Sequence, residues 1–135
     1  MIWTLEVKLV CGIYAQGPWE ATIEIDSAAT LEDLHRAIQS AVRFGDDHLY
    51  LFYVARSHTS RARTVFEDKD GSLETKLAEL FPLPWNRKLF YWFDFSDDWK
   101  FSIDRTRTAP RGPHKGGRYP KLVATRGDTP VQYPL

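Results

Sequence analysis

The sequence predicts an α+β fold in which a mixed β-sheet of about five strands is crossed by one main helix, in the manner of a β-grasp. Three observations predict it. Two early segments alternate apolar and polar residues, one capped stretch has apolar residues at helical spacing, and two later segments are apolar on both faces. A short second helix and an irregular C-terminal tail complete the prediction.

The first two strands are expected at residues 3–9 and 19–26. In both segments every second residue is apolar and most residues between are polar, which is typical of a strand with one buried face. Gly12, Gly17 and Pro18 lie between the two segments and favour a turn. The sequence therefore predicts an antiparallel hairpin.

The main helix is expected to begin after Thr30. Thr30 can cap its N-terminus, with Asp33 three residues later as the reciprocal partner. Gly45 is expected to close it. The apolar residues of this stretch fall on one stripe, which comprises Leu31, Leu34, Ile38, Ala41 and Val42.

Residues 49–55 and 89–95 are apolar on both faces, so they are predicted to be central strands covered on both sides. Residues 99–103 alternate again and are predicted to form an outer strand. Between the central strands we expect a polar excursion, a short strand at 64–66 and a short helix that ends before Pro82. After Thr106 the pattern indicates a loop, with a weak strand signal near 122–124.

Length and composition favour a single domain. The chain has 135 residues, 43% of them hydrophobic and 14% aromatic, so it can bury a sizeable core and is not disordered. We expect residues 1–104 to form the sheet domain and 105–135 a basic, Gly/Pro-rich segment of the same domain. Leu34, Ile38, Phe93 and Ile23 should share one interior.

Cysteine content and the N-terminus bear on the compartment. Cys11 is the only cysteine, which excludes an internal disulfide and a cysteine-rich zinc site and favours a reducing compartment. It is interpreted as a packed small side chain or, alternatively, as a nucleophile. The first ten residues lack the apolar run of a signal peptide, and no stretch reaches membrane-spanning length. We therefore expect a soluble, cytoplasmic protein with no membrane partner.

The charges are unevenly distributed although they cancel overall. Residues 1–104 hold 11 Lys plus Arg against 17 Asp plus Glu, whereas residues 105–127 hold seven basic residues and no acidic one. Such a run can follow a phosphate backbone, or it can pack along the acidic remainder of its own domain. The candidate nucleic-acid-binding residues are Arg105, Arg107, Arg111, Lys115, Arg118 and Lys121, with Arg126 and Tyr119 beside them.

Three segments form an ordered set: TLEDLHRAIQSAV (30–42), DDHLYLF (46–52) and FDFSDDW (93–99). With Trp19, Ile23, Tyr119 and Pro120, they make the chain resemble the plasmid pRiA4b ORF-3-like family over nearly its whole length. The resemblance implies a bacterial or archaeal domain, alone or within a larger protein, with a compact α+β fold and no established activity. Descriptions of members as resolvase-like or repressor-like have no mechanistic support.

The chain departs from the family pattern at several positions. Ser96 stands where the family usually has Gly, Phe101 where a His often follows the Trp, and Glu20 where an Arg often follows the earlier Trp. Arg43 replaces a common Gly, and the C-terminal Cys-Pro-Pro-Glu-Asp run is absent. Any ligand site that used the missing His or Cys would be altered here.

Two histidines and several carboxylates are candidates for chemistry. His35 lies beside the apolar stripe, where it either packs with a backbone hydrogen bond or takes a metal or proton-transfer role. His48 either bonds a turn carbonyl or joins a metal site. The weak candidate metal ligands are Asp46, Asp47, His48, Asp94, Asp97 and Asp98; they suit Mg²⁺ or Mn²⁺, or Zn²⁺ with His35, if the turn at 94–98 approaches 46–48.

No catalytic motif is complete, since neither a nucleophile elbow nor a phosphate-binding loop is present. No cofactor is predicted. The leading hypothesis is a non-enzymatic binding module for an unidentified protein partner, with Trp85 and Trp92 as candidate contacts. Nucleic-acid binding through the basic segment and metal-assisted hydrolysis are the alternatives.

Overall fold

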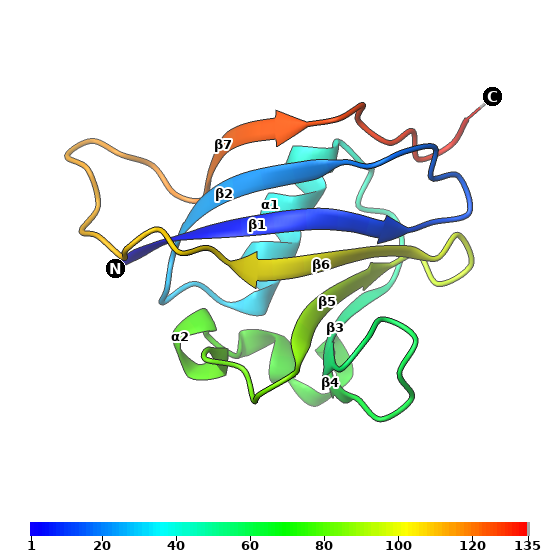
Figure 1. Ribbon diagram of the computed structural model, residues 1–135, viewed down its shortest axis with the longest axis horizontal. Helices are drawn as coiled ribbons and strands as arrows, with labels where there is room; N and C mark the ends of the chain where they lie inside the picture. Colours follow the sequence, from blue (N-terminus) through cyan, green and yellow to red (C-terminus); the bar gives the residue numbers. More distant parts are fainter. Residues whose placement is uncertain (135) are drawn as a thin grey trace.

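The computed structural model describes residues 1–134 and shows a seven-stranded sheet with one long helix against one face (Figure 1). The strands lie in the order β4-β3-β5-β6-β1-β2-β7, and every neighbouring pair is antiparallel. The strands are β1 (Ile2–Cys11), β2 (Glu20–Asp26), β3 (Tyr50–Ala55), β4 (Thr64–Phe66), β5 (Lys88–Phe93), β6 (Trp99–Arg105) and β7 (Lys121–Arg126). The helices are α1 (Leu31–Val42) and α2 (Leu77–Leu80), with 3₁₀ turns η1 (Asp68–Asp70) and η2 (Ser72–Glu74).

The predicted mixed sheet of about five strands, and with it the β-grasp topology, is wrong. α1 carries the chain from β2 to β3, but these two strands are not neighbours, and β3 pairs antiparallel with β4 and β5. No parallel pair forms within the described residues. The tail is also less irregular than predicted, because residues 121–126 form β7 beside β2. All six residues of β7 are exposed, so no buried face marked it in the sequence.

The prediction of an outer strand at 99–103 is also wrong, because β6 lies between β5 and β1. An outer strand would expose its polar residues to solvent, yet Lys100 and Ser102 are each only 8% exposed. The loop after β3 accounts for part of this: the Lys100 ammonium approaches the carbonyl of His58 (3.5 Å) and lies 5.0 Å from the centre of the Trp92 ring. The Lys100 side chain is therefore covered, although it lies at a position where the alternation predicts exposure to solvent.

The hairpin and the main helix are confirmed. β1 and β2 pair antiparallel with Leu5 opposite Ile23. At the start of α1 the Thr30 hydroxyl accepts from the Asp33 amide (3.2 Å), and the Asp33 carboxylate accepts from the Thr30 amide (2.9 Å), as the capping box requires. The predicted end at Gly45 is wrong, because Arg43 closes the helix in the left-handed conformation with φ of 60°.

One apolar cluster fills the space between α1 and the sheet. Ile23, Leu34, Ile38 and Phe93 all belong to it and are at most 1% exposed, as the sequence predicts. A smaller cluster of Tyr53, Ala55 and Phe90 lies on the opposite face, so β3 and β5 are covered on both sides. On that same face, β1 and β2 carry partly exposed polar side chains, among them Glu6, Glu20 and Thr22.

Residues 106–120 form a long loop that extends away from the sheet before the chain returns as β7 (Figure 1). β7 is followed by Gly127, whose φ of 88° and contact with the Pro18 carbonyl leave no room for a side chain. Among the described residues, no helix is long and apolar enough to cross a membrane.

The left-handed Arg43 gives a test of the helix end. We expect Arg43→Gly to be more stable than Arg43→Ala by about 1 kcal/mol, because glycine adopts positive φ without the Cβ clash. Both variants lose the same charge, so chemical denaturation of the pair isolates the backbone effect. Equal midpoints and slopes for the two would contradict the assigned helix end.

Candidate functional site

His35 forms the centre of a buried polar network at the face of α1 that meets the sheet. It is 3% exposed, and its Nδ1 lies 2.6 Å from the Tyr91 hydroxyl. Its Nε2 lies 2.9 Å from Oδ2 of Asp46, and its ring stacks on Tyr50 with centroids 3.5 Å apart. One prediction from the sequence is that His35 bonds the backbone. His35 bonds instead to side chains of β5 and of the loop after α1, and it stacks on a side chain of β3.

The hydrogen bonds determine which nitrogen of His35 holds the proton. The Gln39 amide donates to the Tyr91 oxygen (2.9 Å), so the single Tyr91 O–H is free to donate to Nδ1. Nε2 then carries the proton and donates to Asp46. Burial lowers the pKa of His35, although Asp46 opposes this, and burial raises the pKa of Tyr91. The network is a neutral imidazole held between a phenol and a carboxylate.

A surface pocket of about 300 Å³ lies beside this network, lined by residues of α1 and of the segment before β3. Asp46 and His48 line it together with Glu32 and Asp68, and the Arg36 guanidinium is already paired with Glu32 at 3.0 Å. The pocket is therefore predominantly acidic, and His35 reaches it only at its inner wall.

The turn between β5 and β6 approaches residues 47–48, which the sequence alone could not establish. Nε2 of His48 lies 2.6 Å from the Tyr133 hydroxyl, 3.3 Å from Oδ2 of Asp94 and 3.7 Å from Oδ1 of Asp47. Asp97 adjoins this cluster, because its amide donates to Asp94 (3.3 Å). The aspartates hold a turn as well, since the Asp98 amide donates to the Asp94 carbonyl (2.7 Å).

The other predicted metal ligands point elsewhere. Asp46 is bound to His35, and Asp98 faces Lys100 at 3.6 Å. Within residues 1–134, no three His, Cys, Asp or Glu side chains converge in a way that could hold a metal ion. Burial and the neighbouring Asp94 raise the pKa of Asp97. The metal site stays a prediction that this geometry does not favour.

Cys11 is half-buried beside Asp98, with its Sγ 3.6 Å from the Asp98 carbonyl. Burial and the Asp98 carboxylate raise the pKa of the thiol, which disfavours the thiolate that a nucleophile needs. This environment supports the interpretation of Cys11 as a packed side chain.

The C-terminal segment is fastened to the loop after α1 by a contact that sequence analysis missed. The Gln132 side chain accepts from the Gly45 amide (2.7 Å) and donates to the Gly45 carbonyl (3.2 Å) and to Asp47 (3.2 Å). Tyr133 donates to Asp47 (3.0 Å), and burial raises its pKa to about 12. No local pattern in residues 130–134 signals this role.

The candidate nucleic-acid-binding residues divide into two groups. Arg111 is paired with Glu24 (2.6 Å), and Arg105 lies over the Trp3 ring, 3.9 Å from its centre. Arg126 is paired with Glu20 (3.2 Å). The remaining basic side chains are exposed and have no ion pair within the described part of the chain: Arg107, Lys115, Arg118 and Lys121.

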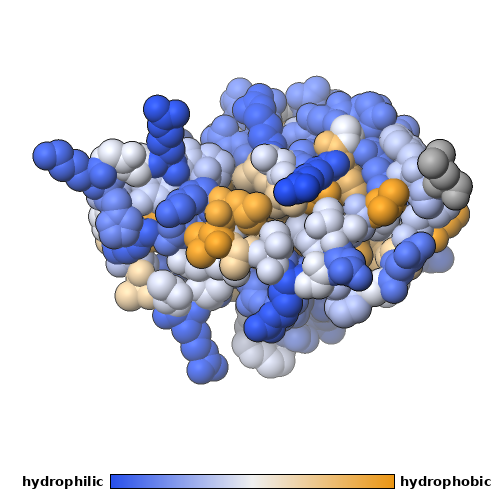
Figure 2. Space-filling model, turned by 90° about the horizontal axis from the view of Figure 1, so that it is seen from above, coloured by the Kyte–Doolittle hydropathy of each residue, from blue (hydrophilic) through white to orange (hydrophobic). Residues whose placement is uncertain are grey.

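β7 forms one edge of the sheet and presents an apolar patch to solvent. Leu122 is 47% exposed and Val123 is 50% exposed. Figure 2, seen from the side of β7, shows apolar residues in the middle of this surface with hydrophilic side chains around them. Hereafter the β7 edge denotes Lys121–Arg126 with its unpaired side. The strand also contains a bulge, because the register shifts by one residue opposite Thr22 and Ile23.

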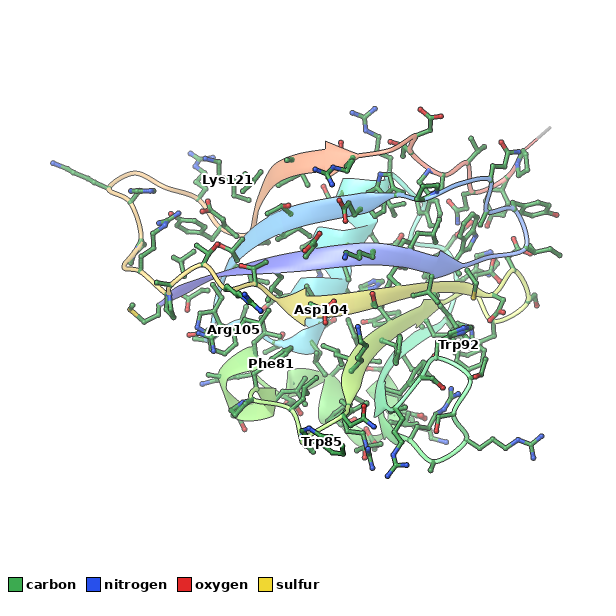
Figure 3. All side chains as sticks on the ribbon, in the orientation of Figure 1. Phe81, Trp85, Trp92, Asp104, Arg105 and Lys121 are labelled. Carbon is green, nitrogen blue, oxygen red and sulfur yellow. The ribbon has the colours of Figure 1, made fainter. Side chains whose placement is uncertain are left out.

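The two tryptophans proposed as contacts have different environments. Trp85 is 89% exposed, on the loop between α2 and β5, whereas Trp92 is half-buried against Phe95 with ring centres 4.6 Å apart. Figure 3 shows Trp85 far from Lys121, which lies at the start of β7. They therefore belong to separate surfaces.

A sequence profile of the plasmid pRiA4b ORF-3-like proteins matches residues 15–132. The chain belongs to this family. A similar solved structure is the crystal structure of a protein of unknown function, MM3350 from Methanosarcina mazei Go1. It is 24% identical, with a TM-score of 0.73 over 92% of this chain and 68% of that chain, and this likeness shows the fold alone. The comparison with curated proteins finds no match.

Two departures from the pRiA4b ORF-3-like pattern are now explained. Phe101, which stands where a His is frequent, is fully buried against Trp19 with ring centres 6.0 Å apart. Phe101 therefore contributes to the core packing of the domain. Glu20, which stands where an Arg is frequent, pairs with Arg126 on β7 and so joins the neighbouring strands.

The neutral His35 predicts a pH dependence of stability. The pKa of an unfolded histidine is about 6.5, and that of folded His35 is lower, so between the two the unfolded state binds more protons. Stability is therefore complete above this range and is lost as the pH falls through it. We expect His35→Gln to flatten the fall in unfolding free energy between about pH 7 and 5. If the unfolding free energy of His35→Gln fell with pH as steeply as that of the wild type, the assignment of a neutral His35 in the folded state would be refuted. His114→Gln, in the exposed loop, is the control.

The Gln132 contact predicts a second loss of stability. Gln132→Ala should cost about 1–3 kcal/mol, because the Gly45 amide and carbonyl lose their partner. Denaturant titration measures this, and Val131→Ala, at a position 58% exposed, is the matched control. A loss for Gln132→Ala no larger than that of the control would show that the contact contributes little.

Proposed function

We propose that this domain is a non-enzymatic protein-interaction module that binds an extended polypeptide segment as an additional strand beside β7. The observation that carries the proposal is the exposed β7 edge, in which all six residues are exposed and Leu122 and Val123 are about half exposed. The unpaired N–H and C=O groups of an edge strand can bond a partner backbone directly.

The other edge of the sheet is less suited to this role. β4 has only three residues, and it follows Arg61 and Arg63. Arg63 covers the Tyr53 ring at 4.0 Å. A very short strand is one of the usual ways in which an edge is protected from pairing. β7 is the longer edge and has exposed apolar side chains at its centre.

The polar network supports binding rather than catalysis. A general base must come within hydrogen-bond reach of the proton that it removes. His35 is 3% exposed, and both of its ring nitrogens are already bonded within the fold. It is better suited to hold α1, β5 and the loop at Asp46 together.

The basic segment gives less support to nucleic-acid binding. Arg105, Arg111 and Arg126 are engaged within the domain, and the other cations are spread along the 106–120 loop and the start of β7. Binding to a phosphate backbone requires several cations at once. We therefore place nucleic acid among the outcomes to be tested.

The proposal predicts where selected ligands will bind. Peptides of about 12 residues, selected from a random display library against the wild-type protein, should protect the amides of β7 from hydrogen exchange when they bind. They should lose at least about tenfold in affinity with Val123→Pro, because proline removes a donor and fixes φ at the edge.

Trp85→Ala is the control for the other exposed apolar site, and it should bind the same peptides with unchanged affinity. An edge strand tolerates proline, so circular dichroism should show Val123→Pro folded. Peptides that bind Val123→Pro equally well, or that protect amides outside β7 and its neighbours, would refute the proposal.

A further inference from the structure

We infer that the segment bound beside β7 alternates acidic and apolar residues, with an apolar side chain in a pocket between β7 and α1 and carboxylates beside Lys121. The inference rests on the proposed function and specifies the chemistry of its partner. Three features support it: the pocket, the positive charge at the β7 edge and the like-charge repulsion that opposes pairing of two copies of this chain.

The pocket lies between α1 and residues 120–122, where the chain enters β7. It has a volume of about 170 Å³ and is lined chiefly by Ala37, Ser40, Ala41, Pro120 and Leu122, with the fully buried Ile23 at its base. This is smaller than the ~300–1,000 Å³ of a drug-sized site, and it suits a single aliphatic side chain. The Arg36 guanidinium at its rim is already paired with Glu32 and Asp33.

Strand alternation connects this pocket to the sequence of the partner. In an added strand, successive side chains point to opposite faces of the sheet. Residues facing α1 meet the pocket, which is mainly apolar. Residues facing the other way lie over the open side of the sheet, beside Lys121 and Arg126.

Lys121 is an exposed cation on this side of the sheet. Its cross-strand neighbour is Glu24, but that carboxylate is bound by Arg111 at 2.6 Å. Lys121 therefore has no ion pair within residues 1–134. Arg118 and Lys115 in the adjacent loop are also exposed and add positive charge. An acidic strand would supply the missing partners.

The same charges disfavour a second copy of this chain as the occupant. Two β7 edges that paired antiparallel about a two-fold axis, with all six residues matched, would place Lys121 opposite Arg126 of the other copy at both ends. Like charges directly opposite across two strands are destabilising. The edge thus resists self-pairing and still accepts an acidic strand.

The test uses three synthetic peptides of about eight residues in which valine alternates with glutamate, glutamine or lysine. Each peptide is titrated into the isotope-labelled wild-type protein, and the amide chemical shifts of β7 are followed. We expect these shifts to report binding of the glutamate peptide. We expect the glutamine peptide to bind about three- to tenfold more weakly and the lysine peptide more weakly still, since each exposed ion pair contributes little. Added salt should reduce the difference.

Three variants separate the contributions. Lys121→Glu should remove the preference for glutamate over glutamine, whereas Arg61→Glu, an equal charge change at the opposite edge, should leave it unchanged. Ser40→Trp should fill the pocket mouth and weaken the glutamate peptide at least about fivefold relative to Ser40→Ala, because the valine can no longer enter. Ser40 is exposed on α1, so both variants should fold.

The outcomes distinguish the inference from the function on which it rests. If the three peptides protect β7 equally, strand addition stands and the acidic preference is overturned. If none perturbs β7 while selected peptides also fail, the proposed function is wrong as well. Tighter binding of a duplex DNA of about 20 base pairs, lost in Lys121→Glu and steeply salt-dependent, would overturn the inference in favour of nucleic acid.

Discussion

The packing of α1 against the apolar face of the sheet is the interaction on which the rest of the structure depends. Burial of apolar surface is the main favourable term in folding, and here one 12-residue helix supplies the cover. The same contact brings His35 to Tyr91 and forms one wall of the pocket beside β7. Both candidate sites therefore derive from the position of a single helix.

The His35 network specifies that position further. Apolar packing alone tolerates small shifts of a helix along a sheet, but buried polar groups must keep their partners. His35 and Gln39, one turn apart, both bond the Tyr91 hydroxyl, so α1 has one register against β5. Asp46 then fixes the loop that follows the helix, to which Gln132 fastens the C-terminal segment.

The β7 edge combines charged ends with exposed apolar side chains at its centre. β7 has cations at both ends and a bulge, features that limit unspecific strand pairing. Its exposed Leu122 and Val123 nevertheless leave apolar surface that a matching strand would bury. Under the proposed function, specificity would come from charge and affinity from backbone hydrogen bonds.

The sequence by itself determined the local elements: the β1–β2 hairpin, the capped α1 with its apolar stripe and the buried segments at β3 and β5. These follow from period and capping, which act between residues close in the chain. Strand order, the inner place of β6 and the extent and pairing of the weakly signalled strand at 121–126 were decided only by the tertiary structure. β7 has no buried face, so its sequence gives only a weak strand signal. β6 alternates as an outer strand would, but a loop distant in the chain covers its Lys100 side chain, and alternation alone does not reveal that cover. The His35–Tyr91 contact and the approach of Asp94 to His48 likewise join residues far apart in the chain, and such contacts leave no periodic signal.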